Sequence, residues 1–182
     1  MYDSVLFYKE KVSKSPGRSA IRNLPGKYFL ATIHRAENTD VTENLSVLFN
    51  AFSSLGLPVV LPLHPRTRKM ISGAFRISPN IRIIEPVGYL EMLKLIIDSE
   101  KVITDSGGLQ KEAYFLQKQC ITIRSETEWL ETLHDNWNIV TGIDPEKILK
   151  AIHSPYPLSK QKSEFGNGSA AQIIVDKLRD KL

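Results

Sequence analysis

Short apolar runs alternate with amphipathic segments along most of this chain. The apolar runs predict strands at 28–33, 58–63, 81–84, 101–104, 120–123 and, more weakly, 138–140. The intervening segments carry apolar residues at helical spacing and predict helices at 42–55, 66–72, 89–97, 109–117, 128–136 and 145–152. Nearly continuous apolar strands between helices are typical of a parallel sheet covered on both faces. We therefore expect a doubly wound, Rossmann-like α/β domain.

The two ends of the chain have a different character. Residues 1–26 predict a short helical lead-in that ends in Leu24-Pro25-Gly26, a turn signal. Residues 27–153 form the predicted Rossmann-like domain. Residues 154–182 are rich in Pro, Ser, Lys and Gly up to 168 and predict a surface crossing. A last helix, from 170 to 182 with Ser169 as its N-cap, is expected to pack back on the domain.

The composition fits one soluble globular domain, because 42% of the 182 residues are hydrophobic and 24% are charged. The single cysteine, Cys120, lies in an apolar run. It excludes a disulfide framework, favours a reducing cytoplasmic setting and predicts a buried thiol. The net charge of +4 comes from Lys and Arg spread along the chain, which argues against nucleic-acid binding. No apolar run approaches the roughly 20 residues that cross a bilayer, and we expect no membrane association.

Chemically useful side chains gather where predicted strands end. The stretches 32–35, 63–66 and 104–108 each follow a buried run. In an open parallel sheet, ligands bind outside the carboxyl ends of the strands. These three stretches are therefore the candidate site.

Ser106-Gly107-Gly108 stands where a strand gives way to a helix. Free amides at a helix N-terminus attract phosphate, and glycines let a ligand approach the backbone. Glu112, one turn further on, is placed to accept two ribose hydroxyls. The alternatives are a tight turn with a capped helix, and a solvated glutamate.

His34 and Arg35 place a titratable ring and a fixed cation at one strand end. Both can hold phosphate, and His can also move a proton. The alternative is a capping network in which Glu37 and Asn38 satisfy the amides of the following loop. His64 and the basic residues after it repeat the pattern at the next strand, where cations at a helix start call for a compensating negative charge.

A charged cluster, Arg124 to Trp129, ends another strand. Glu126 and Glu128 fit a capping box or first-turn acids. Trp129 fits either a packing residue or one wall of a ligand pocket. No Cys/His spacing indicates zinc and no P-loop is present, so we expect neither metal nor cofactor.

Taken in order, these pieces resemble the C-terminal half of bacterial UDP-N-acetylglucosamine 2-epimerases. The resemblance is carried by "ATIHRAENTD", "LPLHPRTRK", "ITDSGGLQKEA", "RSETEWLET" and "EFGNGSAAQIIVDKL". It implies one of two Rossmann-like domains of a glycosyltransferase-B-type fold, with the active site between them.

The family converts UDP-GlcNAc to UDP-ManNAc. A proton leaves C2, UDP is eliminated to give 2-acetamidoglucal, and UDP is added back on the other face. A hydrolysing branch releases ManNAc and UDP instead. The resemblance implies no metal or nicotinamide, and it points to the synthesis of cell-surface polysaccharide precursors.

Site roles follow from the resemblance. Ser106, Gly107 and Gly108 are expected to hold the diphosphate, and Glu112 the ribose hydroxyls. His34 is expected to contact the diphosphate as the catalytic residue that assists UDP departure. Arg35 is expected to serve as a second cation. Arg124, Glu128 and Trp129 complete a possible pocket.

Two departures from the family pattern bear on the substrate. Trp129 replaces an arginine, and Val87 replaces a glutamine. The tryptophan resembles a branch that acts on UDP-diacetamido-uronic acids.

The family's proton-transferring carboxylates belong to its N-terminal domain, for which 182 residues leave no room. We therefore expect a domain that binds UDP or a UDP-amino sugar, lacks activity alone and needs the N-terminal domain from the same gene or a partner chain. Full-length relatives are often dimers. A free-standing nucleotide-binding module is the alternative.

Overall fold

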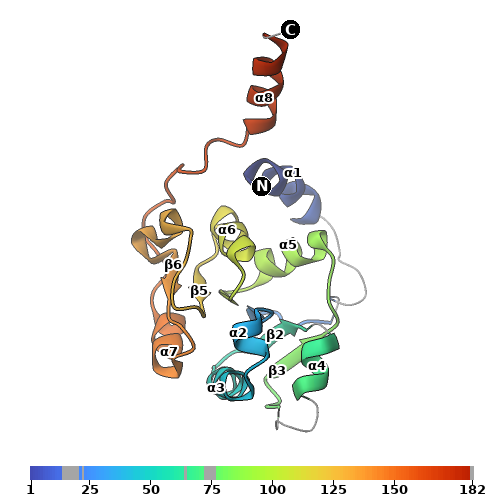
Figure 1. Ribbon diagram of the computed structural model, residues 1–182, viewed down its shortest axis with the longest axis vertical. Coiled ribbons are helices and arrows are strands. Elements are labelled where there is room, and N and C mark those ends of the chain that lie inside the picture. Colours follow the sequence, from blue (N-terminus) through green and yellow to red (C-terminus); the bar gives the residue numbers. More distant parts are fainter. Residues whose placement is uncertain (14–20, 22, 64, 72–76, 181–182) are drawn as a thin grey trace.

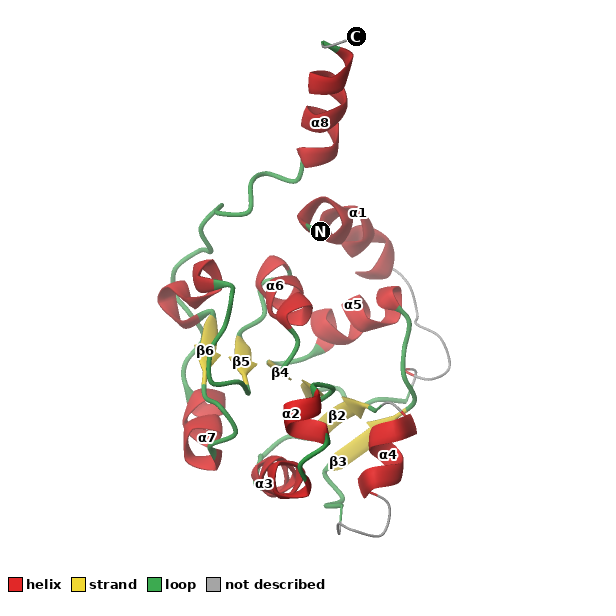
Figure 2. Ribbon diagram, in the orientation of Figure 1, coloured by secondary structure: helices red, strands yellow, loops and turns green. Residues whose placement is uncertain are grey.

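The computed structural model describes residues 1–13, 21, 23–63, 65–71 and 77–180. Within these residues, six parallel strands form one sheet in the order β3-β2-β1-β4-β5-β6 (Figures 1 and 2). The strands are β1 (Phe29–Thr32), β2 (Val59–Pro62), β3 (Ile81–Ile84), β4 (Val102–Thr104), β5 (Cys120–Thr122) and β6 (Asn138–Val140). This is the strand order of a doubly wound Rossmann fold, so the predicted fold class is confirmed.

Helices cover both faces of the sheet. One face is covered by α1 (Tyr2–Ser13), α5 (Tyr89–Asp98) and α6 (Gly107–Phe115). The other is covered by α3 (Thr42–Ser53), α4 (Pro65–Ile71) and α7 (Pro145–His153). A short helix, α2 (Ala36–Thr39), links β1 to α3, and η2 (Leu130–Asn136) and α8 (Ala170–Arg179) follow later in the chain.

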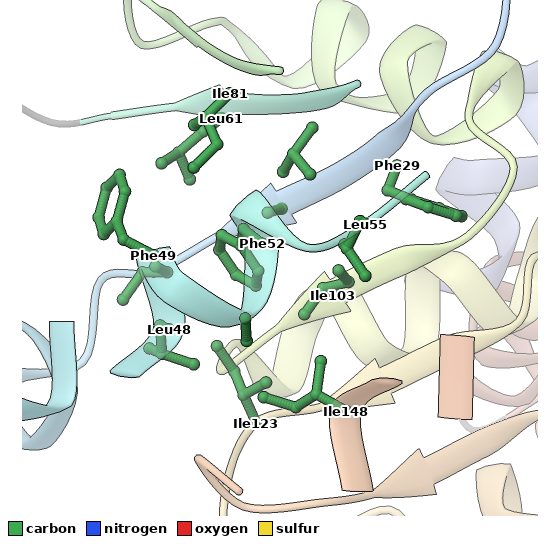
Figure 3. Packing of buried hydrophobic residues seen from close by; sticks show 14 of the residues in the cluster. Phe29, Leu48, Phe49, Phe52, Leu55, Leu61, Ile81, Ile103, Ile123 and Ile148 are labelled. Atoms are coloured by element: carbon green, nitrogen blue, oxygen red, sulfur yellow. The ribbon is translucent and has the colours of Figure 1, made fainter. Parts of the chain in front are cut away.

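The core has two parts because successive strand residues face opposite sides of the sheet. In β1, Phe29 and Ala31 join the cluster under α3 and α7, which Figure 3 shows in part. Leu30, between them, joins the cluster under α1, α5 and α6. Both faces are buried, so these strands read as continuous apolar runs rather than as an alternating pattern.

The chain reverses its direction of winding between β1 and β4. β1 pairs with β2 on one side and β4 on the other, while the later strands continue outward from β4. Thr32, Thr104 and Thr122 lie in register at the carboxyl ends of β1, β4 and β5. The segments that follow these strands therefore emerge side by side at the topological switch point.

Most predicted elements appear within a few residues of their expected bounds. Cys120 is fully buried as expected, and burial raises the pKa of its thiol to about 12. The α-helix expected at 128–136 is wrong, because this segment is a 3₁₀ helix, η2, interrupted at His134 and Asp135. Asp135 and Asn136 have positive φ, a left-handed conformation that these residue types tolerate and that ends a right-handed helix.

Helix α8 also departs from expectation. Ser169 makes no capping hydrogen bond to it, and Oδ2 of Asp3 instead accepts one from the amide of Ala171 at 2.9 Å. The helix does not pack back on the domain, since none of its residues is buried and it extends past α1, away from the sheet (Figure 1). Among the described helices, none combines the length and apolar character needed to cross a membrane.

The core cluster under α3 and α7 provides a test of the fold. Leu61 of β2 is completely buried, so Leu61→Ala should lower the free energy of unfolding by about 2–5 kcal/mol. Leu158→Ala, at a fully exposed position, should change it by no more than about 0.5 kcal/mol. Urea denaturation of both variants measures the difference, and equal losses would contradict this description of the core.

Candidate functional site

A buried carboxylate joins the segments that follow β1 and β4. Asp105 is completely buried directly after β4. It accepts hydrogen bonds from the amides of His34 (3.1 and 3.2 Å) and Arg35 (3.0 Å) and from Nδ2 of Asn38 (2.9 Å). The sequence placed Asn38 only in a possible capping network and assigned no role to Asp105. An acid placed directly after a buried strand was the available signal, because a buried carboxylate needs such donors.

The same carboxylate orients His34. Nδ1 of His34 lies 2.9 Å from Oδ1 of Asp105, and 55% of the histidine side chain is exposed. This hydrogen bond raises the pKa of His34, against partial burial and the nearby charge of Arg35. Burial alone would raise the pKa of Asp105, but hydrogen bonds from His34, Asn38 and the Arg35 amide outweigh it and lower that pKa. The pair therefore holds the ring through Nδ1 and leaves Nε2 outside this contact.

Ser106 caps the N-terminus of α6. Its Oγ accepts from the amide of Leu109 at 3.3 Å, and its own amide donates to Oγ1 of Thr104 at 2.9 Å. Gly107 and Gly108 are the first two residues of the helix, where backbone amides have no acceptor within the helix. The N-terminal amides and the helix dipole together favour an anion at this point.

A side chain at Gly107 would crowd Trp129. A Cβ there would lie 3.0 Å from Nε1 of Trp129 and 3.6 Å from Oε2 of Glu128. Trp129 thus forms a wall beside the start of α6, and Nζ of Lys111 lies 3.4 Å from the centroid of its ring. Within the described residues, the buried indole N–H has no hydrogen-bond partner.

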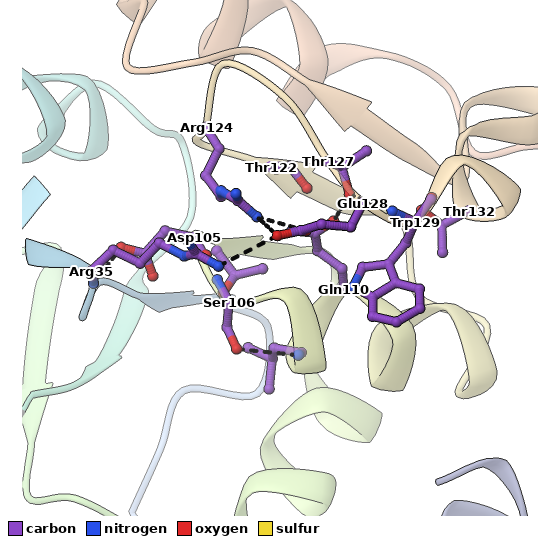
Figure 4. Close-up of polar contacts among 12 residues, drawn as sticks. Arg35, Asp105, Ser106, Gln110, Thr122, Arg124, Thr127, Glu128, Trp129 and Thr132 are labelled. Atoms are coloured by element: carbon purple, nitrogen blue, oxygen red, sulfur yellow. Dashed lines mark hydrogen bonds and ion pairs between the residues drawn. The ribbon is translucent and has the colours of Figure 1, made fainter. Parts of the chain in front are cut away.

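Two arginines meet one carboxylate above α6 (Figure 4). Nη1 of Arg124 donates to both carboxylate oxygens of Glu128, at 2.8 and 3.0 Å. Nη2 of Arg35 lies 3.7 Å from the same group. The capping-box interpretation of Glu128 is therefore wrong, because the arginine before it binds its carboxylate. This hydrogen bond from Arg124 lowers the pKa of Glu128.

A buried polar network fixes the loop that carries Glu128 and Trp129. Oε1 of Gln110 accepts from Oγ1 of Thr127 and, at 3.1 Å, from Nδ2 of Asn138. Asn138 also donates to Oγ1 of Thr132, whose hydroxyl donates to the carbonyl of Trp129. Side chains that are far apart in the sequence thus tie the loop to α6 and β6.

An open hollow of about 230 Å³ lies beside these elements. Its lining residues are Thr32, Ile33, His34, Pro62, Pro86, Val87, Met92, Ser106 and Leu109. The structure thus brings His34 and Ser106, predicted independently, to one cavity with largely apolar walls.

Glu112 is not among the residues that line this hollow. It is three residues beyond Leu109 on α6, hence on the same side of the helix, and only 9% of it is exposed. Burial raises its pKa, against the charge of Lys111. Its charge in turn contributes to the raised pKa of Tyr89, so the carboxyl faces the start of α5.

The second predicted histidine, His64, lies outside the described residues. The negative charge expected near the basic helix after it comes from Glu85, whose Oε1 is 2.6 Å from Nη1 of Arg68. Across the described part of the chain, no three His, Cys, Asp or Glu side chains are grouped as metal ligands.

The Asp105 network generates a pH-dependent prediction. The pKa of His34 is raised in the folded state. Its stabilising contribution is therefore complete below the unfolded value of about 6.5 and disappears as the pH rises through the folded value. His34→Ala should lower the melting temperature at pH 6 and have little effect at pH 9. Differential scanning calorimetry at both values measures this.

Asp105→Ala is the matched comparison. It removes the acceptor of buried amides as well as the imidazole partner, so it should cost roughly 2–4 kcal/mol at both pH values. A pH-independent effect of His34→Ala would contradict the proposed linkage.

Comparison with known proteins identifies the family of this chain. The sequence model described as UDP-N-acetylglucosamine 2-epimerase matches residues 1–179. A UDP-N-acetylglucosamine 2-epimerase homolog from Methanococcus maripaludis is 43% identical across 99% of this chain and 53% of its own length. A UDP-2,3-diacetamido-2,3-dideoxy-D-glucuronate 2-epimerase from Pseudomonas aeruginosa is 37% identical, across 98% of this chain and 50% of its own.

Comparison with solved structures points to the same family. The UDP-GlcNAc 2-epimerase from Methanocaldococcus jannaschii, crystallised in complex with UDP-GlcNAc and UDP, superimposes with a TM-score of 0.83 at 34% identity. The match covers 98% of this chain and 52% of that one. The chain spans about half the length of these relatives, and its fold is that of one domain of their glycosyltransferase-B-type architecture. The chain belongs to the UDP-N-acetylglucosamine 2-epimerase family and corresponds to the C-terminal half of its full-length members.

Proposed function

We propose that this chain is the UDP-binding half of a nucleotide-sugar 2-epimerase that converts UDP-GlcNAc to UDP-ManNAc. The observation that carries the proposal is the convergence of His34 with Ser106, Gly107 and Gly108 at the switch point of the sheet, beside an apolar hollow. The M. jannaschii relative, crystallised with UDP-GlcNAc and UDP, supports it.

The diphosphate belongs at the N-terminus of α6 in this proposal. The amides of Gly107 and Gly108 point their partial charge at it, and the Ser106 hydroxyl donates a hydrogen bond. His34, held through Nδ1 by Asp105, presents Nε2 to a phosphate oxygen. Arg35 adds a fixed charge nearby. Donors arranged before the reaction stabilise the charge of a departing UDP without reorganisation.

The nucleoside occupies the hollow. A base has two apolar faces, and Pro62, Pro86, Val87 and Met92 supply apolar walls. The buried carboxyl of Glu112, just beyond Leu109, accepts the ribose hydroxyls. Two hydrogen bonds to the carboxylate would favour its charged form and offset the burial that raises its pKa.

The reaction requires a second domain. A base there removes the C2 proton as the bond from C1 to the diphosphate oxygen breaks. In the second step the diphosphate oxygen bonds C1 again, and a proton is delivered to the opposite face of C2. This chain's part is to hold UDP through elimination and re-addition. Helix α8 offers a surface for the other half, because Ile173, Ile174, Val175 and Leu178 are all exposed.

A second candidate substrate is a UDP-diacetamido-uronic acid. The 37% identity to the P. aeruginosa enzyme favours it. Trp129, which stands where the family resemblance leads us to expect an arginine, agrees with this alternative. The same UDP site serves either sugar, and a role in cell-surface polysaccharide synthesis fits both.

Binding of UDP tests the site. Isothermal titration calorimetry should detect UDP binding by the wild-type chain, and Ser106→Ala and Glu112→Gln should each weaken it about tenfold, because each loses hydrogen bonds that involve a charged group. Ser53→Ala and Glu43→Gln, exposed positions on α3, are matched controls and should bind as the wild type does. Unchanged binding in both site variants would show that the site lies elsewhere.

Turnover tests the need for the other half. The chain alone should bind UDP yet leave UDP-GlcNAc and the diacetamido-uronate analogue unconverted, as followed by proton NMR. Epimerisation by the purified chain would overturn the assignment of proton transfer to the N-terminal domain. Conversion of one substrate after addition of that domain would identify the sugar.

A further inference from the structure

Glu128 occupies a position suited to an anionic ligand. Its carboxylate receives two hydrogen bonds from Arg124 and lies 3.7 Å from Nη2 of Arg35 (Figure 4). Oε2 also lies 3.6 Å from the point that a Cβ on Gly107 would occupy. Two guanidinium groups and the positive end of α6 thus surround one carboxylate, which is the environment that a phosphate group prefers.

Buried polar contacts hold the backbone on either side of Glu128, whereas its side chain is half exposed. Thr127 and Thr132, on either side of Glu128, belong to the buried network around Gln110. The Thr127 hydroxyl also accepts from the amide of Trp129 at 3.1 Å. By contrast, 53% of the Glu128 side chain is exposed. Rotation about its side-chain bonds can therefore remove the carboxylate without disturbing the loop.

Each of the two arginines keeps another partner when the Glu128 carboxylate moves away. Only 9% of the Arg124 side chain is exposed, so it needs an anionic partner. Its Nε lies 3.9 Å from Oε1 of Glu37, which remains when Glu128 leaves. Arg35 likewise keeps the hydrogen bond from its Nε to the carbonyl of Asp105 at 3.0 Å. An incoming phosphate would take over the interactions that Glu128 gives up.

We propose that Glu128 is an internal competitor for the diphosphate: its carboxylate neutralises the anion site in the free chain, and nucleotide binding displaces it. The proposal rests on the proposed function, since it takes the α6 N-terminus as the diphosphate site. It adds that the chain binds UDP more weakly than it would if the Glu128 carboxylate did not occupy the cations of the site. It also adds that the carboxylate assists nucleotide release when it returns to these cations.

The test compares Glu128→Gln with Glu126→Gln by titration calorimetry at low ionic strength. Glu126 is a neighbouring exposed acid and serves as the matched control. Glu128→Gln should bind UDP and inorganic pyrophosphate about two- to fivefold more tightly than the wild type, the range expected when an exposed ion pair no longer competes. Uridine affinity should not change, because uridine lacks the diphosphate. Glu128→Ala should act in the same direction, because loss of the charge is the cause.

The outcomes separate the two proposals. Unchanged or weaker UDP binding by Glu128→Gln, while Ser106→Ala still loses binding, would overturn the competitor role alone and show that Glu128 only holds the arginines in place. No UDP binding by the wild-type chain would overturn the proposed function and this inference with it. A similar gain in Glu126→Gln would also overturn the inference, because the effect would then be one of general charge.

Discussion

The candidate site depends on one buried carboxylate. Asp105 lies at the switch point, where β1 and β4 are neighbours in the sheet. The chain between these two strands forms β2 and β3, on the other side of β1. Its oxygens accept the amides of His34 and Arg35 and the amide group of Asn38. Since a buried carboxylate without donors is very costly, the two loops hold one arrangement. That arrangement sets the position of both the imidazole and the start of α6.

The second constraint is the network centred on Gln110. It joins α6 to β6 and to the loop of Glu128 and Trp129, so the two sides of the α6 N-terminus are fixed by different polar clusters. Its members are neutral side chains, which hold the loop without adding charge next to the proposed anion site. The charged groups nearby, Arg35, Arg124 and Glu128, are then the ones a ligand can rearrange.

The core that supports the candidate site lies within this chain. Two apolar clusters, one on each face of the sheet, enclose the strands, and the site stands at the sheet's edge rather than on its faces. Helix α8 is the exception. Its apolar residues contribute to neither cluster, which agrees with a helix that serves an interface rather than the domain itself.

The sequence by itself determined the fold class, most of the elements, the burial of Cys120 and the candidate anion-binding turn. Each of these depends on local composition or periodicity, which neighbouring residues reveal. The broken helix at 130–136 was missed because its interruption depends on positive φ at Asp135 and Asn136, which amphipathic spacing does not report.

Only the tertiary structure decided which side chains meet. Asp105 and His34 are 71 residues apart, and Gln110 and Asn138 are 28 apart. Strand order and register bring these pairs together, and many strand orders suit the same hydrophobic pattern. The sequence therefore indicated the kinds of groups at the site. Their partners, and the placement of the Glu128 carboxylate over Gly107, required the packed sheet.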